Sequence, residues 1–318
     1  MYKLPDMAIW QGRVDADSTR WYQHVHAWDG SQDLQQATTL MGFACDEGVR
    51  RNQGRTGARE GPNHIRSALA NLAYQNNSSV FDAGDVICAD QLLEDAQRLA
   101  ANNIVNVLQH NGNPIILGGG HEVAWASFMG LRQYLDDNNS QSKLGIINFD
   151  AHFDLRNPDP QANSGTPFRQ IAEYCEQHEQ EFNYQVFGIN PSVNSQALFD
   201  YAGSKKVDYY FDSTCVTNNI DQLNMVLQDF LKKVDNLYVS ICLDVFPSHV
   251  APGVSAPAVV GVEPKLVIML LQLIRKLCAQ NNIRWQLTDI AEMNPTYDIN
   301  DQTAKLAARL VYEISSGR

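Results

Sequence analysis

The chain has 318 residues, with 24 Lys or Arg against 36 Asp or Glu, so its formal net charge is −12. The apolar share of 44% is enough for a buried core and excludes a wholly disordered chain. The acidic balance argues against a nucleic-acid partner and against electrostatic attachment to a membrane surface, because both need basic patches.

Eight short runs rich in Val, Ile, Leu and Phe recur along the chain and end in Gly, Asp or Pro. Each is too short for a helix and too continuously apolar for a strand with one solvated face. This pattern favours strands buried on both faces of a mainly parallel sheet. In chain order the runs cover residues 38–45, 79–86, 113–120, 143–150, 184–190, 207–212, 237–244 and 284–290.

Segments with apolar residues at helical spacing alternate with these strands, which predicts an α/β layered fold. No repeat, low-complexity tract or linker interrupts the alternation, so we expect residues 1–318 to form one domain. The long polar segment 155–168 follows a strand end and is the expected functional loop. The predicted helices cover residues 94–109, 123–135, 220–234, 263–279 and 303–314.

Neither a signal peptide nor a membrane-spanning segment is predicted. The first twenty residues carry charges and lack an apolar run, and the longest apolar stretch, 266–274, is far below membrane-spanning length. The six cysteines are scattered with no CxxC spacing, which is typical of reduced thiols and not of a disulfide framework. We therefore expect a cytoplasmic protein.

The motif NFDAHFD at residues 148–154 follows a predicted strand. Asp150, His152 and Asp154 alternate, and in an extended chain they point to the same side of the backbone. Open α/β sheets place ligands at the carboxyl ends of their strands. Two carboxylates and an imidazole at such an end indicate half of a metal site; the alternative is a polar strand end that caps neighbouring loops.

Three more strand ends carry candidate residues. His121 follows three glycines that permit a tight turn, and a helix-terminal histidine with a local hydrogen bond is the alternative. Cys242 and Asp244 close another strand, where a buried thiol and a loop-capping carboxylate are the alternatives. Glu292 follows the last strand, where a solvated loop acid is the alternative.

Four strand ends that meet at one rim would assemble a mixed set of oxygen and nitrogen ligands. Such a set suits a hard or borderline divalent cation, and Mn²⁺ fits it better than a structural zinc ion does. Six ligands exceed what one catalytic ion with an open position needs, so two ions that share a carboxylate and activate a water molecule are favoured. The candidate ligands are His121, Asp150, His152, Asp154, Cys242 and Asp244.

These motifs, in this order, resemble those of the ureohydrolase family, which contains arginase, agmatinase and formimidoylglutamase. The family patterns GGxH, DAHxD and SxDxD correspond here to residues 118–121, 150–154 and 240–244. The resemblance implies an arginase-like three-layer α/β/α sandwich around a mainly parallel eight-stranded sheet, with two bound Mn²⁺ ions.

The resemblance also divides the ligands between the two ions. One ion would be held by His121, Asp150 and Asp154, and the other by Asp150, His152 and Asp244. In the family, the residue at the position of Cys242 would bridge both ions.

Within the family, the strings at 52–58, 118–128 and 243–258 resemble those of formimidoylglutamases most. Gly120 stands where arginases and agmatinases typically have Asp, and Ser164 stands where they tend to have His. The implied reaction is hydrolysis of N-formimidoyl-L-glutamate to L-glutamate and formamide, a step of histidine degradation. A related guanidino or amidino hydrolase of the agmatinase type is the alternative.

Side-chain chemistry assigns further roles on this premise. Asp154 is the expected proton shuttle to the leaving amine, and Glu292 would orient the cationic amidinium group. Arg55 and Arg156 are the expected partners of the two substrate carboxylates, with surface ion pairs as the alternative. Ser164 would donate a hydrogen bond in the same pocket, with a solvated loop serine as the alternative.

Cys242 departs from the family pattern, which has a metal-bridging aspartate at this position. A thiol is soft and poorly suited to Mn²⁺. We therefore predict that one ion, the one at His121, binds more weakly, with reduced activity or a changed metal preference. The alternative is that the protein is a catalytically impaired relative that is kept for binding.

A small-molecule substrate is the expected partner, and a homo-oligomer is compatible with the sequence.

Overall fold

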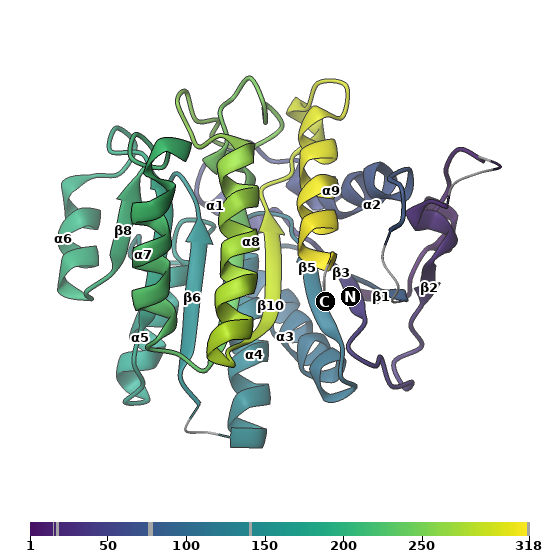
Figure 1. Cartoon of the computed structure of the whole chain (residues 1–318), viewed down its shortest axis with the longest axis horizontal. Coiled ribbons are helices and arrows are strands. Elements are labelled where there is room, and N and C mark those ends of the chain that lie inside the picture. The colour runs from purple at the N-terminus through teal and green to yellow at the C-terminus, as the bar shows by residue number, and fades with distance from the viewer. Residues whose placement is uncertain (15, 17–18, 76–78, 140–141, 317–318) are drawn as a thin grey trace.

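The computed structural model describes residues 1–14, 16, 19–75, 79–139 and 142–316. Strands and helices alternate along the chain, and the strands form one sheet (Figure 1). None of the helices in the described ranges is long and apolar enough to span a bilayer.

Eight parallel strands form the body of the sheet. In spatial order they are β4 (Val80–Ile87), β3 (Thr38–Ala44), β5 (Asn113–Leu117), β10 (Arg284–Ala291), β9 (Asn236–Cys242), β6 (Leu144–Phe149), β7 (Asn183–Ile189) and β8 (Asp208–Phe211). All eight coincide with the predicted apolar runs. Every residue of β6 and β9 is buried, as expected for strands covered on both faces.

Two short strands that the sequence does not predict complete a ten-stranded sheet within the described residues. Strand β1 (Tyr2–Lys3) pairs antiparallel with the end of β4, and β2 (Val25–Ala27) pairs parallel with its start. Strands of two and three residues are too short to show a periodic pattern. Together they cover the outer edge of β4, which would otherwise expose unpaired backbone groups.

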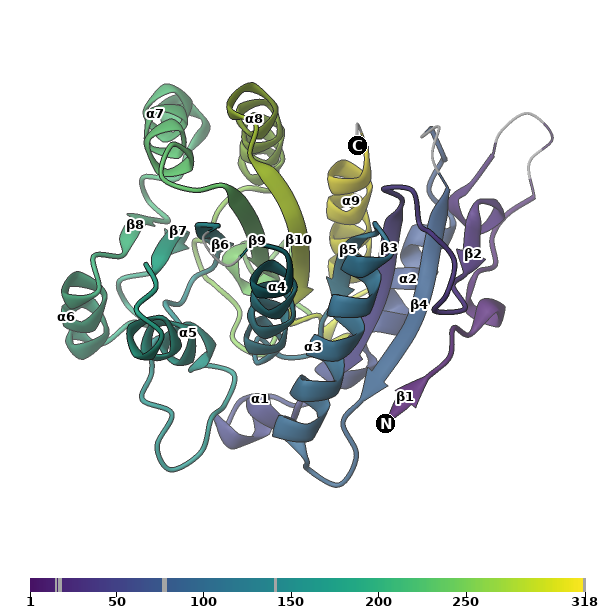
Figure 2. The same cartoon turned by 90° about the horizontal axis from the view of Figure 1, so that it is seen from below.

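Helices cover both faces of the sheet and make the expected three-layer α/β/α sandwich (Figure 2). One apolar cluster packs under the helices of one face, and a second cluster lies under those of the other. The first face carries α2 (Gly61–Ala70), α7 (Ile220–Leu231), α8 (Pro264–Asn281) and α9 (Gln302–Ser315). The opposite face carries α3 (Leu93–Gln109), α4 (Val123–Asn139), α5 (Pro167–Gln177) and α6 (Gln196–Ser204).

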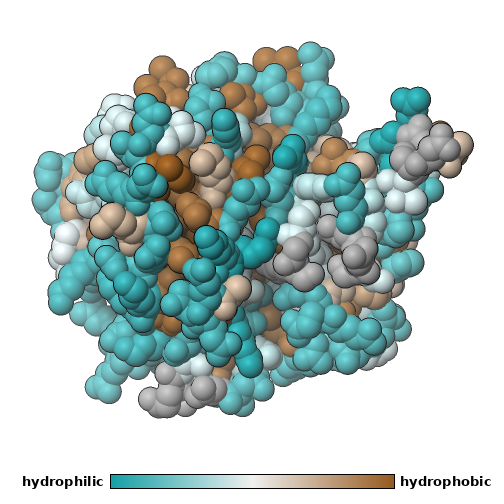
Figure 3. Space-filling view, in the orientation of Figure 1, coloured by the Kyte–Doolittle hydropathy of each residue, from teal (hydrophilic) through white to brown (hydrophobic). Residues whose placement is uncertain are grey.

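The five predicted helices correspond to α3, α4, α7, α8 and α9. Helix α8 shows clear end signals: it begins at Pro264 and is followed by Asn282 with a φ of +56°. The outer face of the layer that contains α7, α8 and α9 is mainly hydrophilic, with hydrophobic residues gathered over α7 and α8 (Figure 3).

The sequence reading misses α2, α5, α6 and the five-residue α1 (Glu47–Arg51). Residues 155–166 form the predicted irregular loop, but Pro167 and Phe168 already belong to α5. The prediction of a loop to residue 168 is therefore wrong at its end, because proline at the first helical position starts a helix as readily as it ends one.

Candidate metal centre

The candidate site residues stand at the carboxyl ends of four strands that are neighbours in the sheet, in the order β5, β10, β9 and β6. His121 follows β5, Glu292 follows β10, Asp244 follows β9 and Asp150 follows β6. Because parallel strands end at the same edge, segments far apart in the sequence meet there.

His121 lies in the turn between β5 and α4, and its side chain is buried. The preceding glycines are needed for close packing and not for a special turn, since none of the three has a positive φ. A Cβ atom at Gly119 would lie 1.7 Å from the carbonyl oxygen of Cys45. That same oxygen accepts a hydrogen bond from the Gly120 N–H at 3.0 Å, which fixes the loop beside β3.

The Asp150–Asp154 segment is bent, not extended as the alternation argument assumes. The chain leaves β6 after Phe149, Asp150 Oδ1 accepts the His152 N–H at 2.7 Å, and Asp154 has a φ of +49°. The bend still brings the side chains together: His121 Nδ1 lies 3.0 Å from Asp150 Oδ2 and 2.9 Å from Asp154 Oδ2.

Cys242 is the last residue of β9, and Asp244 lies in the short 3₁₀ helix Leu243–Val245 that follows. Asp244 Oδ2 is 3.1 Å from His152 Nδ1. The tight turn after the strand thus turns both side chains toward the residues that follow β6.

Two groups of potential ligand atoms result, each with all its atoms within 4.8 Å of one another. One group is His121, Asp150 and Cys242, and the other is Asp150, His152 and Asp244. Asp150 belongs to both groups, as expected of a carboxylate shared by two ions. Cys242 completes the first group, and Asp154 contacts it through His121.

The residues present fit a divalent cation at this position. Asp244 Oδ1 is buried and makes no hydrogen bond within the described part of the chain, and His121 Nδ1 faces two carboxylates. A buried acceptor without a partner is costly, and a cation would satisfy Asp244 Oδ1 and neutralise the carboxylates that gather around His121. The donors are carboxylate oxygens and imidazole nitrogens, with one thiol.

Burial and mutual charge shift the titration of these groups in different directions. Burial would raise the pKa of Asp150, but contact with the His121 and His152 imidazoles outweighs this and holds it below its ordinary value. Burial, with the charge of Asp150, raises the pKa of Asp154 to about 6. Burial and the nearby carboxylates raise the pKa of the Cys242 thiol well above its ordinary value, which favours a neutral thiol.

Glu292 lies next to His121 and lines the same cavity. Its Oε1 accepts the His121 N–H at 3.0 Å, while its Oε2 is buried without a hydrogen-bond partner among the described residues. Burial, with the charges of Asp244 and Glu122, raises the pKa of Glu292 to about 8. A cationic group that entered the cavity would favour the ionised form of Glu292.

A second layer of polar residues fixes the His121 ring. Its Nε2 lies 2.8 Å from Ser240 Oγ, and Ser240 donates to Asp289 Oδ1 at 2.6 Å. Asp289 also accepts hydrogen bonds from Ser127 at 2.6 Å and Tyr238 at 2.5 Å. This chain directs Nδ1 of His121 toward the carboxylates, as outer-layer partners do in metal sites.

The candidate ligand and substrate residues line one cavity of about 340 Å³, apart from Asp150, which lies behind it. Ser164 accepts a hydrogen bond from Asn52 Nδ2 at 3.2 Å. Arg156 is exposed and makes no ion pair with another described residue, which leaves its guanidinium available to a ligand. Its Cδ packs against Gly165, where a Cβ atom would lie only 2.8 Å away.

Arg55 also lines the cavity, but much of its guanidinium is occupied. Its Nε and Nη2 donate to the carbonyls of Ser255 and Val254 at 3.0 and 2.5 Å, and it stacks over Tyr297 at 4.0 Å. Arg55 therefore holds the 254–255 loop, which reduces its capacity to bind a carboxylate with two parallel hydrogen bonds.

Sequence reasoning missed the roles of the supporting residues of this site. Asp289 stands close to Glu292 in the sequence, but its contact with Ser240 depends on which strands lie side by side. Asn52 stands within the conspicuous string NQGRTGA, but its contact with Ser164 depends on how the chain folds.

Comparison with known proteins places these features in a family. Residues 36–316 match the arginase family model. The chain is 43% identical to a formimidoylglutamase of Hahella chejuensis, an alignment that covers 99% of this chain and 96% of the relative. It is 44% identical to one of Aliivibrio fischeri, with 98% and 95% covered.

Solved structures show the same fold. The formimidoylglutamase of Bacillus subtilis matches with a TM-score of 0.83 and 23% identity, covering 96% of this chain and 93% of that one. The formiminoglutamase of Trypanosoma cruzi with Mn²⁺ matches with a TM-score of 0.78 and 25% identity, covering 94% and 98%.

Proposed function

The chain belongs to the arginase family, and on that basis we propose that it is a formimidoylglutamase. Its reaction is the hydrolysis of N-formimidoyl-L-glutamate to L-glutamate and formamide, a step of histidine degradation. The observation that carries this proposal is the identity of 42–44% to several curated formimidoylglutamases over nearly the whole chain. The shared cavity supports it, since it combines a metal-ligand set with a free guanidinium.

The cofactor we propose is a pair of Mn²⁺ ions. His121, Asp150 and Asp154 would hold one ion, and Asp150, His152 and Asp244 the other. When bound, such ions lower the pKa of a water molecule and so supply the nucleophile near neutral pH. Cys242 would offer a neutral thiol where a carboxylate is expected, so the ion at His121 would bind more weakly than its neighbour.

The side chains around the cavity handle protons and charge. Asp154 would accept a proton at its carboxylate and pass it to the leaving amine of glutamate, since it lines the cavity beside the ligand His121. Glu292 would pair its free Oε2 with the amidinium nitrogen and so orient the reacting carbon.

The glutamate part of the substrate carries two carboxylates, which the net charge of −12 does not attract. Arg156 is the main candidate to bind one of them, since its planar guanidinium makes no ion pair with any residue that the structure describes. Ser164 would add a hydrogen bond, and Arg55 a weaker contact, because its nitrogens are largely bound elsewhere. The six buried free thiols suit the reducing cytoplasm, where we place the enzyme.

The test is a product assay on the purified chain loaded with Mn²⁺. Formimidoylglutamate, agmatine, arginine and guanidinobutyrate are each supplied, and formamide and urea are measured separately. We expect formamide from formimidoylglutamate and no urea from the guanidines. Urea release would instead assign an agmatinase-type activity, and binding of formimidoylglutamate without turnover would assign an impaired relative.

A further inference from the structure

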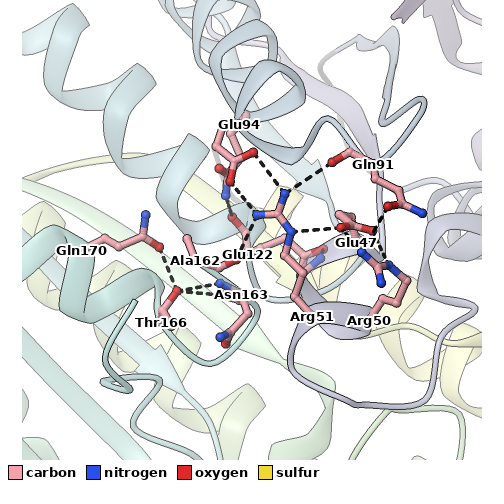
Figure 4. Close-up of polar contacts among 12 residues, drawn as sticks. Glu47, Arg50, Arg51, Gln91, Glu94, Glu122, Ala162, Asn163, Thr166 and Gln170 are labelled. Carbon is pink, nitrogen blue, oxygen red and sulfur yellow. Dashed lines mark hydrogen bonds and ion pairs between the residues drawn. The ribbon is translucent and has the colours of Figure 1, made fainter. Parts of the chain in front are cut away.

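The end of helix α1 meets the irregular loop 155–166 at an arginine whose side chain is mostly covered. Arg51, the last residue of α1, has a side chain that is only 9% exposed. Figure 4 shows its guanidinium between α1, the segment before α3 and the loop. No motif of the metal site includes this residue, and the proposed reaction does not use it.

Each part of the Arg51 guanidinium has a partner. Nε donates to Glu47 Oε1 at 2.9 Å, and Nη1 and Nη2 donate to the Glu94 carboxylate at 2.5 and 3.2 Å. Nη1 also donates to the carbonyl oxygen of Ala162 at 3.1 Å, and Nη2 reaches the Gln91 carbonyl at 3.4 Å. The bond to Ala162 links α1 to a loop more than a hundred residues away in the sequence.

The loop that Arg51 holds ends in a turn that is stiffened by its own hydrogen bonds. Thr166 Oγ1 donates to the Asn163 carbonyl at 2.9 Å and accepts the Asn163 N–H at 3.0 Å, and the Gly165 N–H donates to Asn163 Oδ1 at 2.9 Å. Thr166 directly precedes α5. Residues 163–166 therefore form one hydrogen-bonded unit, and the bond at Ala162 ties the residue before this unit to α1.

This turn contributes Ser164 to the wall of the cavity that the metal ligands also line. Ser164 meets Asn52, the residue next to Arg51, at 3.2 Å. The Gly165 carbonyl accepts the Arg156 N–H at 2.9 Å, and the Arg156 side chain packs on Gly165. Two consecutive residues of one segment, Arg51 and Asn52, thus hold the turn that backs both candidate substrate contacts of this loop.

We propose that Arg51 is a positioning residue for substrate binding: it ties the loop to α1 and so sets where Ser164 and Arg156 stand around the glutamate portion of the substrate. Arg51 touches neither the metal ligands nor the reacting atoms, so its role is in binding and not in the chemical step. The inference rests on the proposed function only in the identity of the substrate.

Arg50 provides a matched control. It neighbours Arg51 and donates to the same Glu47 carboxylate at 2.7 and 2.6 Å, but it makes no contact with the loop (Figure 4). A purely structural effect of losing a Glu47 partner would appear in both Arg50→Ala and Arg51→Ala. An effect through the loop would appear in Arg51→Ala alone.

The kinetic test measures KM and kcat for formimidoylglutamate in wild type, Arg50→Ala, Arg51→Ala and Arg51→Lys, each loaded with Mn²⁺. A net hydrogen bond to a charged group is worth about 1.5 kcal/mol, which corresponds to about tenfold. We expect KM to rise about tenfold or more in Arg51→Ala, less in Arg51→Lys and not in Arg50→Ala, with kcat and bound Mn²⁺ little changed. An equal rise in both alanine variants, or a loss confined to kcat, would overturn the proposal.

Amide hydrogen exchange on the same proteins without substrate gives a second readout. We expect faster exchange in residues 155–166 of Arg51→Ala than in wild type or Arg50→Ala. Unchanged exchange there would also overturn the proposal. If wild type fails to hydrolyse formimidoylglutamate, the proposed function falls, while the exchange comparison still decides whether Arg51 holds the loop.

Discussion

Replacing Cys242 with aspartate tests how the metal centre of this chain differs from the family pattern. The thiol is 1% exposed and lies within 4.8 Å of the His121 and Asp150 ligand atoms. In Cys242→Asp the same position would offer a carboxylate oxygen, a hard ligand that suits Mn²⁺. We expect the variant to bind the ion at His121 more tightly than wild type does.

The size of the gain follows from the ligand change. Loss of an outer-layer partner alone typically costs 10–100-fold in metal affinity, so a direct ligand should contribute at least about tenfold. Tenfold in Kd is about 1.4 kcal/mol. At Mn²⁺ concentrations well above both Kd values, this difference adds to the stabilisation by Mn²⁺, so the metal-induced rise in Tm is about 2 °C larger in the variant than in wild type.

Without metal, the same variant should be less stable than wild type. The new carboxylate would be buried beside Asp150, Asp154 and Asp244, and uncompensated buried charges are costly. The stabilisation by Mn²⁺, and not the Tm by itself, is therefore the quantity to compare.

Equilibrium dialysis with metal analysis gives the Kd and the number of ions per chain, and calorimetry with and without Mn²⁺ gives the stabilisation. Cys242→Ser is the matched control, because it removes the thiol without adding a carboxylate; we expect it to bind Mn²⁺ as wild type does. If Cys242→Asp gains neither affinity nor stabilisation by Mn²⁺, the idea that Cys242 weakens the site is refuted.

Three further predictions follow from the same geometry. Asp289→Asn should weaken Mn²⁺ binding by about 10–100-fold, because it disturbs the hydrogen bond that orients His121 through Ser240; equilibrium dialysis measures this, and an unchanged Kd would contradict it. Arg156→Ala should raise KM for formimidoylglutamate about tenfold or more at similar kcat, and an unchanged KM in steady-state kinetics would remove Arg156 from the substrate site. Mn²⁺ binding at pH 7 should release protons into weakly buffered solution. Burial lowers the pKa of His121, but the Asp150 and Asp154 carboxylates outweigh this effect and hold the pKa well above its ordinary value. The ring is therefore protonated without metal and must lose its proton to bind an ion. Binding without proton release would show that the imidazole is already neutral.

The sequence was sufficient for the parallel core of the sheet and for the convergence of the ligands. The eight central strands are short and mostly apolar and are bounded by Gly, Asp or Pro, a pattern that favours buried parallel strands. Three compact motifs follow three of these strands directly, so placing the strands also places His121, Asp150 and Asp244. The expected geometry of the DAHFD segment was wrong in detail, since a bend and not an extended chain turns its side chains together.

Other parts of the site depend on contacts that leave no pattern in the sequence. Asp289 lies in the buried half of β10, and its role depends on which strands lie beside it. Arg51 and Arg50 are equivalent in sequence, but only Arg51 meets the Ala162 carbonyl. Arg55 and Arg156 are both arginines near predicted ligands, and only their different hydrogen bonding separates a residue that holds a loop from one that is free to bind a ligand.

Asp150 gives the most direct test of the central claim, because its carboxylate belongs to both ligand groups. The decisive measurement is the number of Mn²⁺ ions bound per chain in wild type and in Asp150→Ala at a saturating metal concentration. We predict two ions in wild type and none in Asp150→Ala, since removing the shared carboxylate takes a ligand from both ions. A variant that retained the wild-type metal content would contradict a paired centre built on the ends of these strands.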